Sequence, residues 1–229
     1  MEERAGLKVI ARMESEFPSK FGVPRQSGLV EELRGAVVFE PEYRDPAALR
    51  GIEGFSHLWL IWEFHKARRE TWSPTVRPPR LGGNQRLGVF ATRSPFRPNP
   101  LGLSCVKMER VELHTPRGPV IYVSGGDLMD GTPIYDIKPY VPYTDCRPEA
   151  GDGFAPPPER GLTVEISPEI AAKVPAQRLE ALKGVLSWDP RPHYQADPDR
   201  VYGMAFAGME VKFTVAGKIL TVVDVNEGN

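Results

Sequence analysis

The sequence lacks the features that define several common classes of protein. It has only two cysteines in 229 residues, Cys105 and Cys146, and neither lies in a Cys-x-x-Cys pair, so we expect no disulfide framework. The longest strongly apolar run, Leu58–Trp62, is far too short to span a membrane. The N-terminus has no apolar stretch of signal-peptide length. We therefore expect a soluble, cytoplasmic protein with no membrane partner.

Familiar nucleotide-binding and hydrolase motifs are also missing. No Gly-x-Gly-x-x-Gly motif follows an expected strand, and the chain has neither a P-loop nor a Gly-x-Ser-x-Gly elbow. A Rossmann, P-loop or serine-hydrolase site therefore has no motif support. The chain does contain 24 prolines, about twice the average share, and proline breaks helices. A bundle of long helices is not expected.

Short apolar runs bounded by turn residues predict a β-rich fold. Before residue 140, the runs expected as strands are Leu7–Met13, Gly35–Phe39, Phe55–Phe64, Arg86–Ala91, Leu103–Leu113 and Val120–Ser124. The proline-rich segments Arg77–Arg80, Pro95–Pro100 and Pro139–Pro142 are expected as loops, because proline cannot donate to a strand ladder. We predict a mainly β fold whose N-terminal domain, residues 1–145, is a single-sheet β-barrel.

The last third of the chain shows a different pattern. Residues 146–160 have the Pro- and Gly-rich composition of a linker. Apolar residues at helical spacing predict a helix over Pro175–Trp188, ended by Asp189-Pro190. Three strands are expected after it, at Val201–Phe206, Met209–Val215 and Ile219–Val225, the last two joined by an Ala216-Gly217 turn. Residues 161–229 are predicted to form a small α+β C-terminal domain.

Charge is unevenly distributed in a chain whose net charge is only −1. From Lys66 to Arg97 there are eight basic residues, seven of them arginines, and one acid. From Asp145 to the end the net charge is −4. Because the planar guanidinium suits phosphate, the Lys66–Arg97 segment is a candidate anion-binding surface. The alternative is a solvated loop whose arginines pair with carboxylates elsewhere.

The stretch His57–His65 is a candidate metal site that fails on distance. In a strand, His57, Glu63 and His65 would share one face. The two histidines would then lie roughly 26 Å apart at about 3.3 Å per residue, too far for one ion. We expect no metal.

Two polar clusters carry candidate chemistry. Arg93–Asn99 (RSPFRPN) places arginines, a serine and an asparagine in a loop braced by proline, which lowers the ordering cost of binding. Asp127–Tyr140 (DLMDGTPIYDIKPY) contains three carboxylates and a lysine. Taken alone, its Asp-Gly step is ordinary turn chemistry.

Three stretches together closely resemble the TsaA-like, or TrmO, family. They are Phe21–Gln26 (FGVPRQ), Thr75–Ser104 (TVRPPRLGGNQRLGVFATRSPFRPNPLGLS) and Gly126–Tyr140 (GDLMDGTPIYDIKPY). Asp189–Tyr194 (DPRPHY) and the strands expected after it look like the family's smaller C-terminal domain. The family comprises tRNA methyltransferases acting on N6 of threonylcarbamoyladenosine beside the anticodon. The resemblance implies a single-sheet barrel, S-adenosylmethionine as methyl donor, and a homodimer with the donor site close to the subunit interface.

Candidate residues follow from their positions in the matching motifs. For donor binding they are Arg93, Ser94, Arg97, Asn99, Asp127, Leu128 and Thr132. For catalysis they are Asp130 and Asp136, as bases or sulfonium-facing carboxylates, and Lys138, to stabilise charge on the carbamoyl oxygen. For tRNA they are Arg68, Arg69, Arg77, Arg80 and Arg86 as phosphate contacts, with His57 and Tyr140 lining the pocket.

Two alternative functions remain open at this point. One is an RNA- or nucleotide-binding barrel that no longer transfers methyl groups; the intact Asp127–Lys138 cluster argues against it. The other is a methyltransferase with the same donor and a different acceptor. The arginine-rich segment favours an RNA acceptor but does not name the base.

Overall fold

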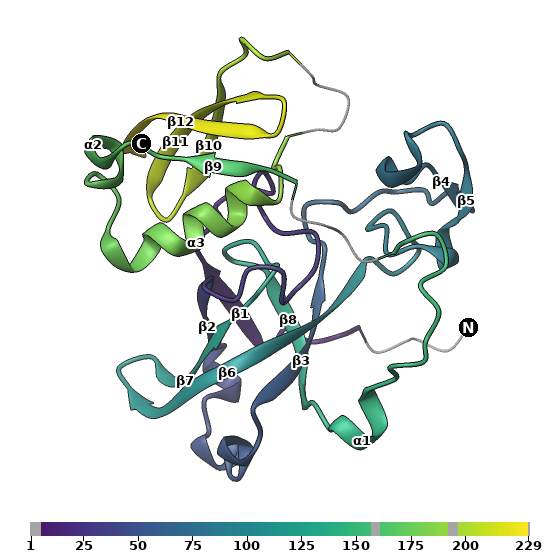
Figure 1. Cartoon of the computed structure of the whole chain (residues 1–229). Coiled ribbons are helices and arrows are strands. Elements are labelled where there is room, and N and C mark those ends of the chain that lie inside the picture. Colours follow the sequence, from purple (N-terminus) through teal and green to yellow (C-terminus); the bar gives the residue numbers. More distant parts are fainter. Residues whose placement is uncertain (1–5, 157–160, 192–196, 229) are drawn as a thin grey trace.

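Six strands close into an antiparallel barrel in the computed structural model, which describes residues 6–156, 161–191 and 197–228, with only the backbone at Arg80 (Figure 1). The strand order around the barrel is β1-β2-β7-β6-β3-β8. The strands are β1 (Ala11–Ser15), β2 (Arg34–Phe39), β3 (His57–Glu63), β6 (Leu101–Thr115), β7 (Gly118–Ser124) and β8 (Pro133–Pro139). The predicted mainly β fold with a closed barrel is confirmed.

Alternation along β3 shows why these residues form a barrel. Leu58, Leu60 and Trp62 are buried in the interior, whereas the side chains between them are only half-buried. Trp62 lies opposite Gly102 of β6. A Cβ atom at Gly102 would lie 2.3 Å from the indole ring, so the barrel interior has room for glycine alone at this point.

Strand β8 is the barrel element that the sequence patterns do not predict. Prolines stand at its first and last positions, Pro133 and Pro139, where a strand tolerates a missing donor. The prediction of a loop over the proline-rich segment Pro139–Pro142 is therefore wrong in part. Pro139 ends β8, and Pro142 begins the one-turn helix α1 (Pro142–Asp145).

Two other strand predictions are wrong at their ends. The first strand begins at Ala11 rather than Leu7, because pairing with β2 and β8 starts there. In the expected strand Arg86–Ala91, only β5 (Leu87–Gly88) pairs, with β4 (Thr75–Val76). Val89–Ala91 instead forms a 3-10 turn.

Residues 64–100, here called the arginine-rich lobe, leave the barrel after β3 and return at β6. They form a separate lobe to one side of the barrel in Figure 1. The lobe contains the β4–β5 hairpin and a 3-10 turn at Pro79–Leu81, part of the segment expected as a loop. Pro95–Pro100 has no helix or strand, as predicted. Three further 3-10 turns, Pro41–Tyr43, Pro46–Leu49 and Ile52–Gly54, connect β2 to β3.

The C-terminal part is a four-stranded sheet with two helices. The sheet order is β10-β11-β12-β9, and the elements are β9 (Thr163–Glu165), α2 (Pro168–Ala171), α3 (Ala176–Ser187), β10 (Tyr202–Phe206), β11 (Met209–Ala216) and β12 (Ile219–Glu227). The predicted helix and three strands are confirmed. The turn between β11 and β12 is Gly217-Lys218 rather than Ala216-Gly217, and Gly217 has the positive φ of 59° that this turn needs.

A second hydrophobic core, beneath this sheet, includes residues from the N-terminal part. Phe17, Val30 and Leu33, from the β1–β2 connection, pack with α3 and β10–β12. Trp188 Nε1 donates to the Leu29 carbonyl at 2.9 Å. The division at residues 145 and 161 stays a prediction, and residues 157–160 of the expected linker lie outside the described residues. Among the described helices, none is both long and apolar enough to cross a membrane.

Candidate functional site

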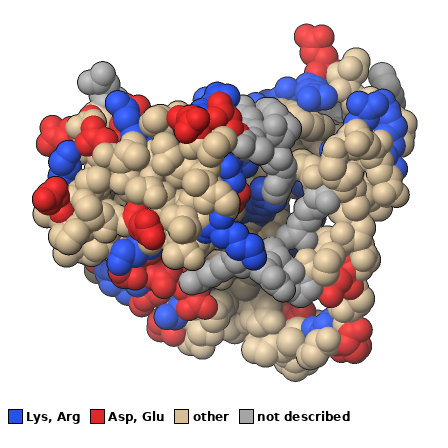
Figure 2. Space-filling model, turned by 45° about the horizontal axis from the view of Figure 1, so that its top comes forward, with Lys and Arg blue, Asp and Glu red and all other residues tan. Residues whose placement is uncertain are grey.

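A groove with a cavity volume of about 2110 Å³ lies against the arginine-rich lobe. Its other walls are Arg25 and Gln26 of the β1–β2 connection, residues 151–155, and Arg191 of the C-terminal part. Figure 2 shows basic side chains in blue beside the hollow of the molecule, and the basic residues that line the groove are arginines. Seven predicted site residues line the groove: Arg68, Arg69, Arg77, Arg86, Arg93, Ser94 and Arg97.

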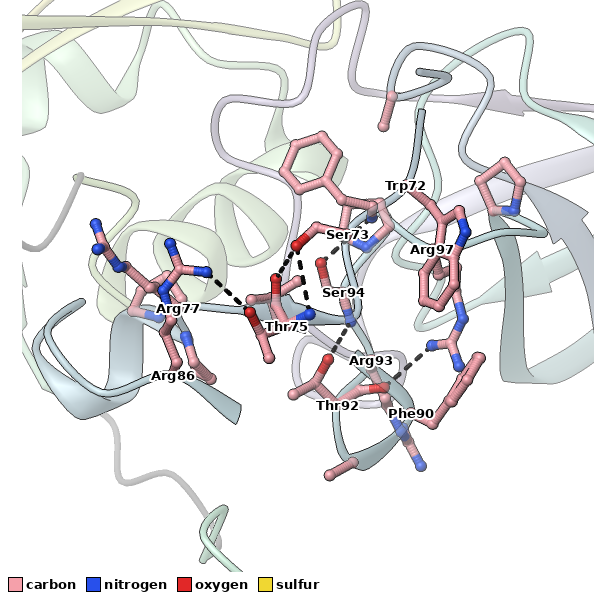
Figure 3. Close-up of a pocket in the computed structure, with 18 of the residues that line it drawn as sticks. Trp72, Ser73, Thr75, Arg77, Arg86, Phe90, Thr92, Arg93, Ser94 and Arg97 are labelled. Carbon is pink, nitrogen blue, oxygen red and sulfur yellow. Dashed lines mark hydrogen bonds between the residues drawn. The ribbon is translucent and has the colours of Figure 1, made fainter. Parts of the chain in front are cut away.

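The β4–β5 hairpin presents two arginines side by side. Val76 pairs with Leu87, so Arg77 and Arg86 occupy the next opposed positions, toward the hairpin end. Arg86 Nη1 donates to Thr75 Oγ1 at 2.9 Å (Figure 3). Like charges in opposed positions repel, and within the described part of the chain no carboxylate pairs with either guanidinium. An anion is the natural complement of this arrangement.

Arg68 is engaged with the barrel. It makes two hydrogen bonds to the Glu63 carboxylate, one of them 2.7 Å from Nη2 to Oε2, and the Tyr135 hydroxyl donates to the same carboxylate. The Arg68 guanidinium lowers the pKa of the buried Glu63. Arg68 therefore anchors the lobe to the end of β3, rather than standing free for phosphate.

Of the two remaining arginines predicted for tRNA, Arg69 lies over an aromatic ring. The guanidinium carbon of Arg69 lies 3.5 Å from the centroid of the Phe96 ring, a cation–π contact that leaves its N–H groups available. The side chain of Arg80 lies outside the described residues.

The loop predicted for the donor is ordered by its own hydrogen bonds. Arg97 Nη1 donates to the Thr92 carbonyl at 3.0 Å, and the Ser94 amide donates to Thr92 Oγ1 at 3.2 Å. Arg93 donates to the side-chain oxygen of Gln26 across the groove wall. The polar groups of this loop are thus positioned without a ligand, which lowers the cost of binding one.

Asp127, also predicted for the donor, does not line the groove and instead bonds to the barrel. Its Oδ1 accepts from Ser104 Oγ at 2.5 Å, and Ser104 Oγ accepts from Trp62 Nε1 at 2.9 Å. Burial raises the pKa of Asp127 to about 6, although the Ser104 hydrogen bond and the nearby positive charge of Arg93 act in the opposite direction. Asp127 is therefore a carboxylate with a raised pKa that lies within the electrostatic reach of Arg93.

The other predicted donor residues do not line the groove. Leu128 is 1% exposed and belongs to the barrel core, and Thr132 is 2% exposed. Asn99 is exposed, and its carbonyl accepts from the Leu101 amide at 2.7 Å.

The predicted catalytic residues lie in other places. Asp136 and Lys138 form an ion pair of 2.9 Å and lie opposite Ile61 and Trp59 of β3. They share the outside of the barrel with two predicted pocket residues, His57 and Tyr140, whose rings are 6.2 Å apart. We call this surface the outer β3–β8 face.

Asp130 lies apart from both the groove and the outer β3–β8 face. It follows Leu128 in the connection to β8, where its Oδ1 accepts from the Ser15 amide at 3.1 Å. Asp130, Asp136 and Lys138 are all absent from the lining of the groove. The structure thus separates the candidate donor and phosphate contacts from the candidate bases.

The possible metal ligands remain apart. His57 lies in β3, where its Nδ1 is 2.9 Å from Ser56 Oγ, whereas His65 lies beyond the end of the strand. Across the described residues, no three His, Cys, Asp or Glu side chains are arranged to hold a metal ion.

Sequence reasoning missed two aromatic residues of the groove. Trp72 and Phe90 are 53% and 72% exposed, and their ring centroids are 6.2 Å apart (Figure 3). The available signal is the presence of aromatic residues within the arginine-rich run Lys66–Arg97. Glu63 was considered only as a metal ligand, and its pairing with Arg68 was not predicted, because a single acid at the end of an apolar strand has no distinctive pattern.

Two protein-family models match this chain. The model of the tRNA-methyltransferase O N-terminal domain matches residues 12–146, and that of the TrmO C-terminal domain matches residues 159–228. Together they span both the barrel and the C-terminal sheet.

Curated proteins and solved structures agree with these matches. A tRNA (adenine(37)-N6)-methyltransferase of Eikenella corrodens is 50% identical, over 70% of this chain and 91% of that protein. The protein of the same name from Escherichia coli K12 is 43% identical, over 81% and 82%. A crystal structure of TrmO from Pseudomonas aeruginosa is 34% identical and superposes with a TM-score of 0.79, covering 99% of this chain and all of that one.

Proposed function

Because the chain belongs to the tRNA-methyltransferase O family, we propose that it methylates N6 of the threonylcarbamoyl-modified adenosine beside the anticodon of tRNA, with S-adenosylmethionine as donor. The observation that carries this proposal is the groove in which a pre-ordered Arg93–Arg97 loop meets opposed arginines of the β4–β5 hairpin. Such a groove offers one end to a small charged donor and the other to a phosphate backbone. A tRNA substrate also supports a cytoplasmic location.

The residues at the loop fit the donor. S-adenosylmethionine carries a carboxylate and ribose hydroxyls, which suit a guanidinium and a carboxylate respectively. Arg93 and Arg97 line the groove, and Asp127 lies close enough to Arg93 for its pKa to respond. We assign donor binding to these three residues and to Ser94.

The acceptor nitrogen, N6 of the modified adenosine, requires a base and charge stabilisation from the protein. When bound, the donor supplies an electrophilic methyl group on a sulfonium sulfur for in-line attack. The lone pair of N6 is delocalised into the carbamoyl group, so N6 must lose its proton as it attacks. We assign proton removal to Asp136, and to Lys138 the stabilisation of negative charge on the carbamoyl oxygen.

We further propose that the protein is a homodimer in which the outer β3–β8 face of one subunit completes the groove of the other. Leu103 of β6 lies opposite Ile61 and is 57% exposed, an apolar patch next to Asp136 and Lys138. Within one chain these two residues do not line the groove. A second copy seated on Leu103 would supply them.

The first experiment is tritium transfer from labelled S-adenosylmethionine to tRNA with and without the threonylcarbamoyl group. We expect label only on the modified tRNA, and none with Asp136→Ala. Label on both tRNAs, or on neither while the donor still binds, would replace the proposed acceptor with another one. Absence of donor binding would support the silent RNA-binding barrel instead.

The dimer is tested with mixed subunits. Arg93→Ala and Asp136→Ala should each be inactive alone. If each site takes Arg93 from one subunit and Asp136 from the other, co-refolded mixtures should regain about a quarter of the wild-type rate. Leu103→Glu should give monomers by light scattering. A monomeric wild-type protein with full activity would contradict this part of the proposal.

A further inference from the structure

Two aromatic side chains stand exposed on the wall of the groove. Phe90 is 72% exposed and Trp72 is 53% exposed, and their rings are tilted by 32° at a centroid distance of 6.2 Å. Large apolar side chains that are adjacent and exposed on a groove wall mark a binding surface. The assigned roles of the groove residues leave both rings unused.

The backbone holds both rings in place. Thr75 pairs with Gly88, and the Val89 amide continues the ladder by donating to the Pro74 carbonyl at 2.9 Å. Trp72 and Phe90 therefore lie on the two arms of the hairpin just beyond its last paired residues. Val89 is 1% exposed, so the side chain next to Phe90 anchors the arm while the ring of Phe90 points outward. A pre-ordered ring binds with little loss of entropy.

Charge around the rings identifies the ligand as RNA. At the opposite end of the same hairpin, Arg77 and Arg86 occupy opposed positions that suit phosphate. Arg69 and Arg97 line the groove as well. Aromatic platforms beside arginines that follow a backbone are the usual means of holding unpaired nucleotides.

We propose that Trp72 and Phe90 form a stacking shelf for an unpaired base of the tRNA anticodon loop next to the target adenosine. This inference rests on the proposed function, since it takes tRNA as the ligand. Stacking requires only a π face and tolerates any base. The shelf therefore contributes affinity and holds the loop open at the target, while the identity of the adenosine is read elsewhere.

The test uses an anticodon stem-loop with 2-aminopurine on one or the other side of the target adenosine, because stacking quenches this fluorophore. Binding to the wild-type protein should quench it on one side. Trp72→Leu and Phe90→Leu, which keep an apolar side chain without a ring, should lose the quenching and weaken RNA binding about tenfold. Trp72→Phe should keep the quenching. Tyr143→Ala removes an 88% exposed aromatic outside the groove and serves as the matched control.

Donor binding and folding distinguish the outcomes. Calorimetric affinity for S-adenosylmethionine should stay within about twofold of wild type in both Leu variants, with an unchanged melting temperature. An equal loss of donor and RNA affinity would overturn the proposal and assign the rings to the adenine of the donor. RNA binding without quenching would overturn the shelf and leave the proposed function standing. A wild-type protein that binds no tRNA would overturn the proposed function, and the shelf with it.

Discussion

The barrel and the arginine-rich lobe differ in how many of their side chains are buried. The barrel strands bury many of their side chains, as Leu58, Leu60 and Trp62 show on β3. Among the described side chains of the lobe, only Pro78 and Val89 are fully buried. The lobe is held instead at its two ends, by the Glu63–Arg68 pair and by the Phe64 amide, which donates to the Pro100 carbonyl at 2.8 Å. The barrel therefore supplies stability, and the lobe supplies groups that a ligand can reach.

The largest expected effect comes from the barrel side of this comparison. Leu60 is fully buried, so Leu60→Ala should lower the free energy of unfolding by about 2–5 kcal/mol. Phe90→Ala removes a larger side chain from the lobe and should change the free energy of unfolding by less than about 0.5 kcal/mol. Chemical denaturation of both variants makes the measurement. Equal losses would show that the lobe folds as part of the barrel core.

The next effect concerns pH, at the junction of the two regions. The pKa of Asp127 is about 6 in the folded chain, against the ordinary aspartate value of 3.8, so the folded state holds an extra proton between these two pH values. Its contribution to the free energy of unfolding is present below about pH 4 and is lost as the pH rises through about 6, by up to roughly 3 kcal/mol. Asp127→Asn should lack this dependence.

Stability curves at pH 4, 5, 6 and 7.5 test that expectation. The difference in the free energy of unfolding between wild type and Asp127→Asn should change between pH 4 and about pH 6 and then level off. Asp130→Asn, which removes an exposed carboxylate that bonds only to the Ser15 amide, is the control and should follow the wild-type profile. A flat difference for Asp127→Asn would mean that this carboxylate is better solvated than its surroundings indicate.

A smaller effect is expected from the lobe, on binding alone. Replacing both Arg77 and Arg86 with alanine should weaken tRNA binding about tenfold, and should reduce the slope of log affinity against log salt by about 1.4. Donor affinity and the melting temperature should not change. Arg110→Ala is the matched control, because Arg110 lies outside the groove and bonds to Glu112. A joint loss of donor affinity would show that the hairpin shapes the donor site.

The smallest effect on global stability tests whether the lobe opens independently. Val89 in the lobe and Val106 in the barrel are each 1% exposed. Val106→Ala should lower the free energy of unfolding by about 1.5 kcal/mol. Val89→Ala should leave it within about 0.5 kcal/mol while amide exchange in residues 72–92 accelerates, because local opening does not expose the barrel. Equal global losses would contradict the independence of the lobe.

Features that depend on neighbouring residues were predicted well from the sequence, and features that depend on distant residues were not. A short apolar run bounded by turn residues is a property of neighbouring residues, so β2, β3, β6 and β7 were predicted nearly to their ends. Strand β8 has prolines at both ends and charged residues between them, so its membership of the sheet depends on β1 and β3 rather than on its own pattern. The 3-10 turn at Val89–Ala91 likewise replaces an expected strand because Val89 is drawn into a buried position.

Sequence alone determined the family, the concentration of arginine between residues 66 and 97, and the β-rich class, because each is written in the order and type of residues along the chain. Only the tertiary structure decided how those residues are used. It engages Arg68 with Glu63, opposes Arg77 to Arg86, bonds Asp127 to Ser104 of the barrel, and turns Asp136 and Lys138 to the outside of the barrel. These outcomes depend on which strands pair and what they enclose, and a sequence read residue by residue contains no distances.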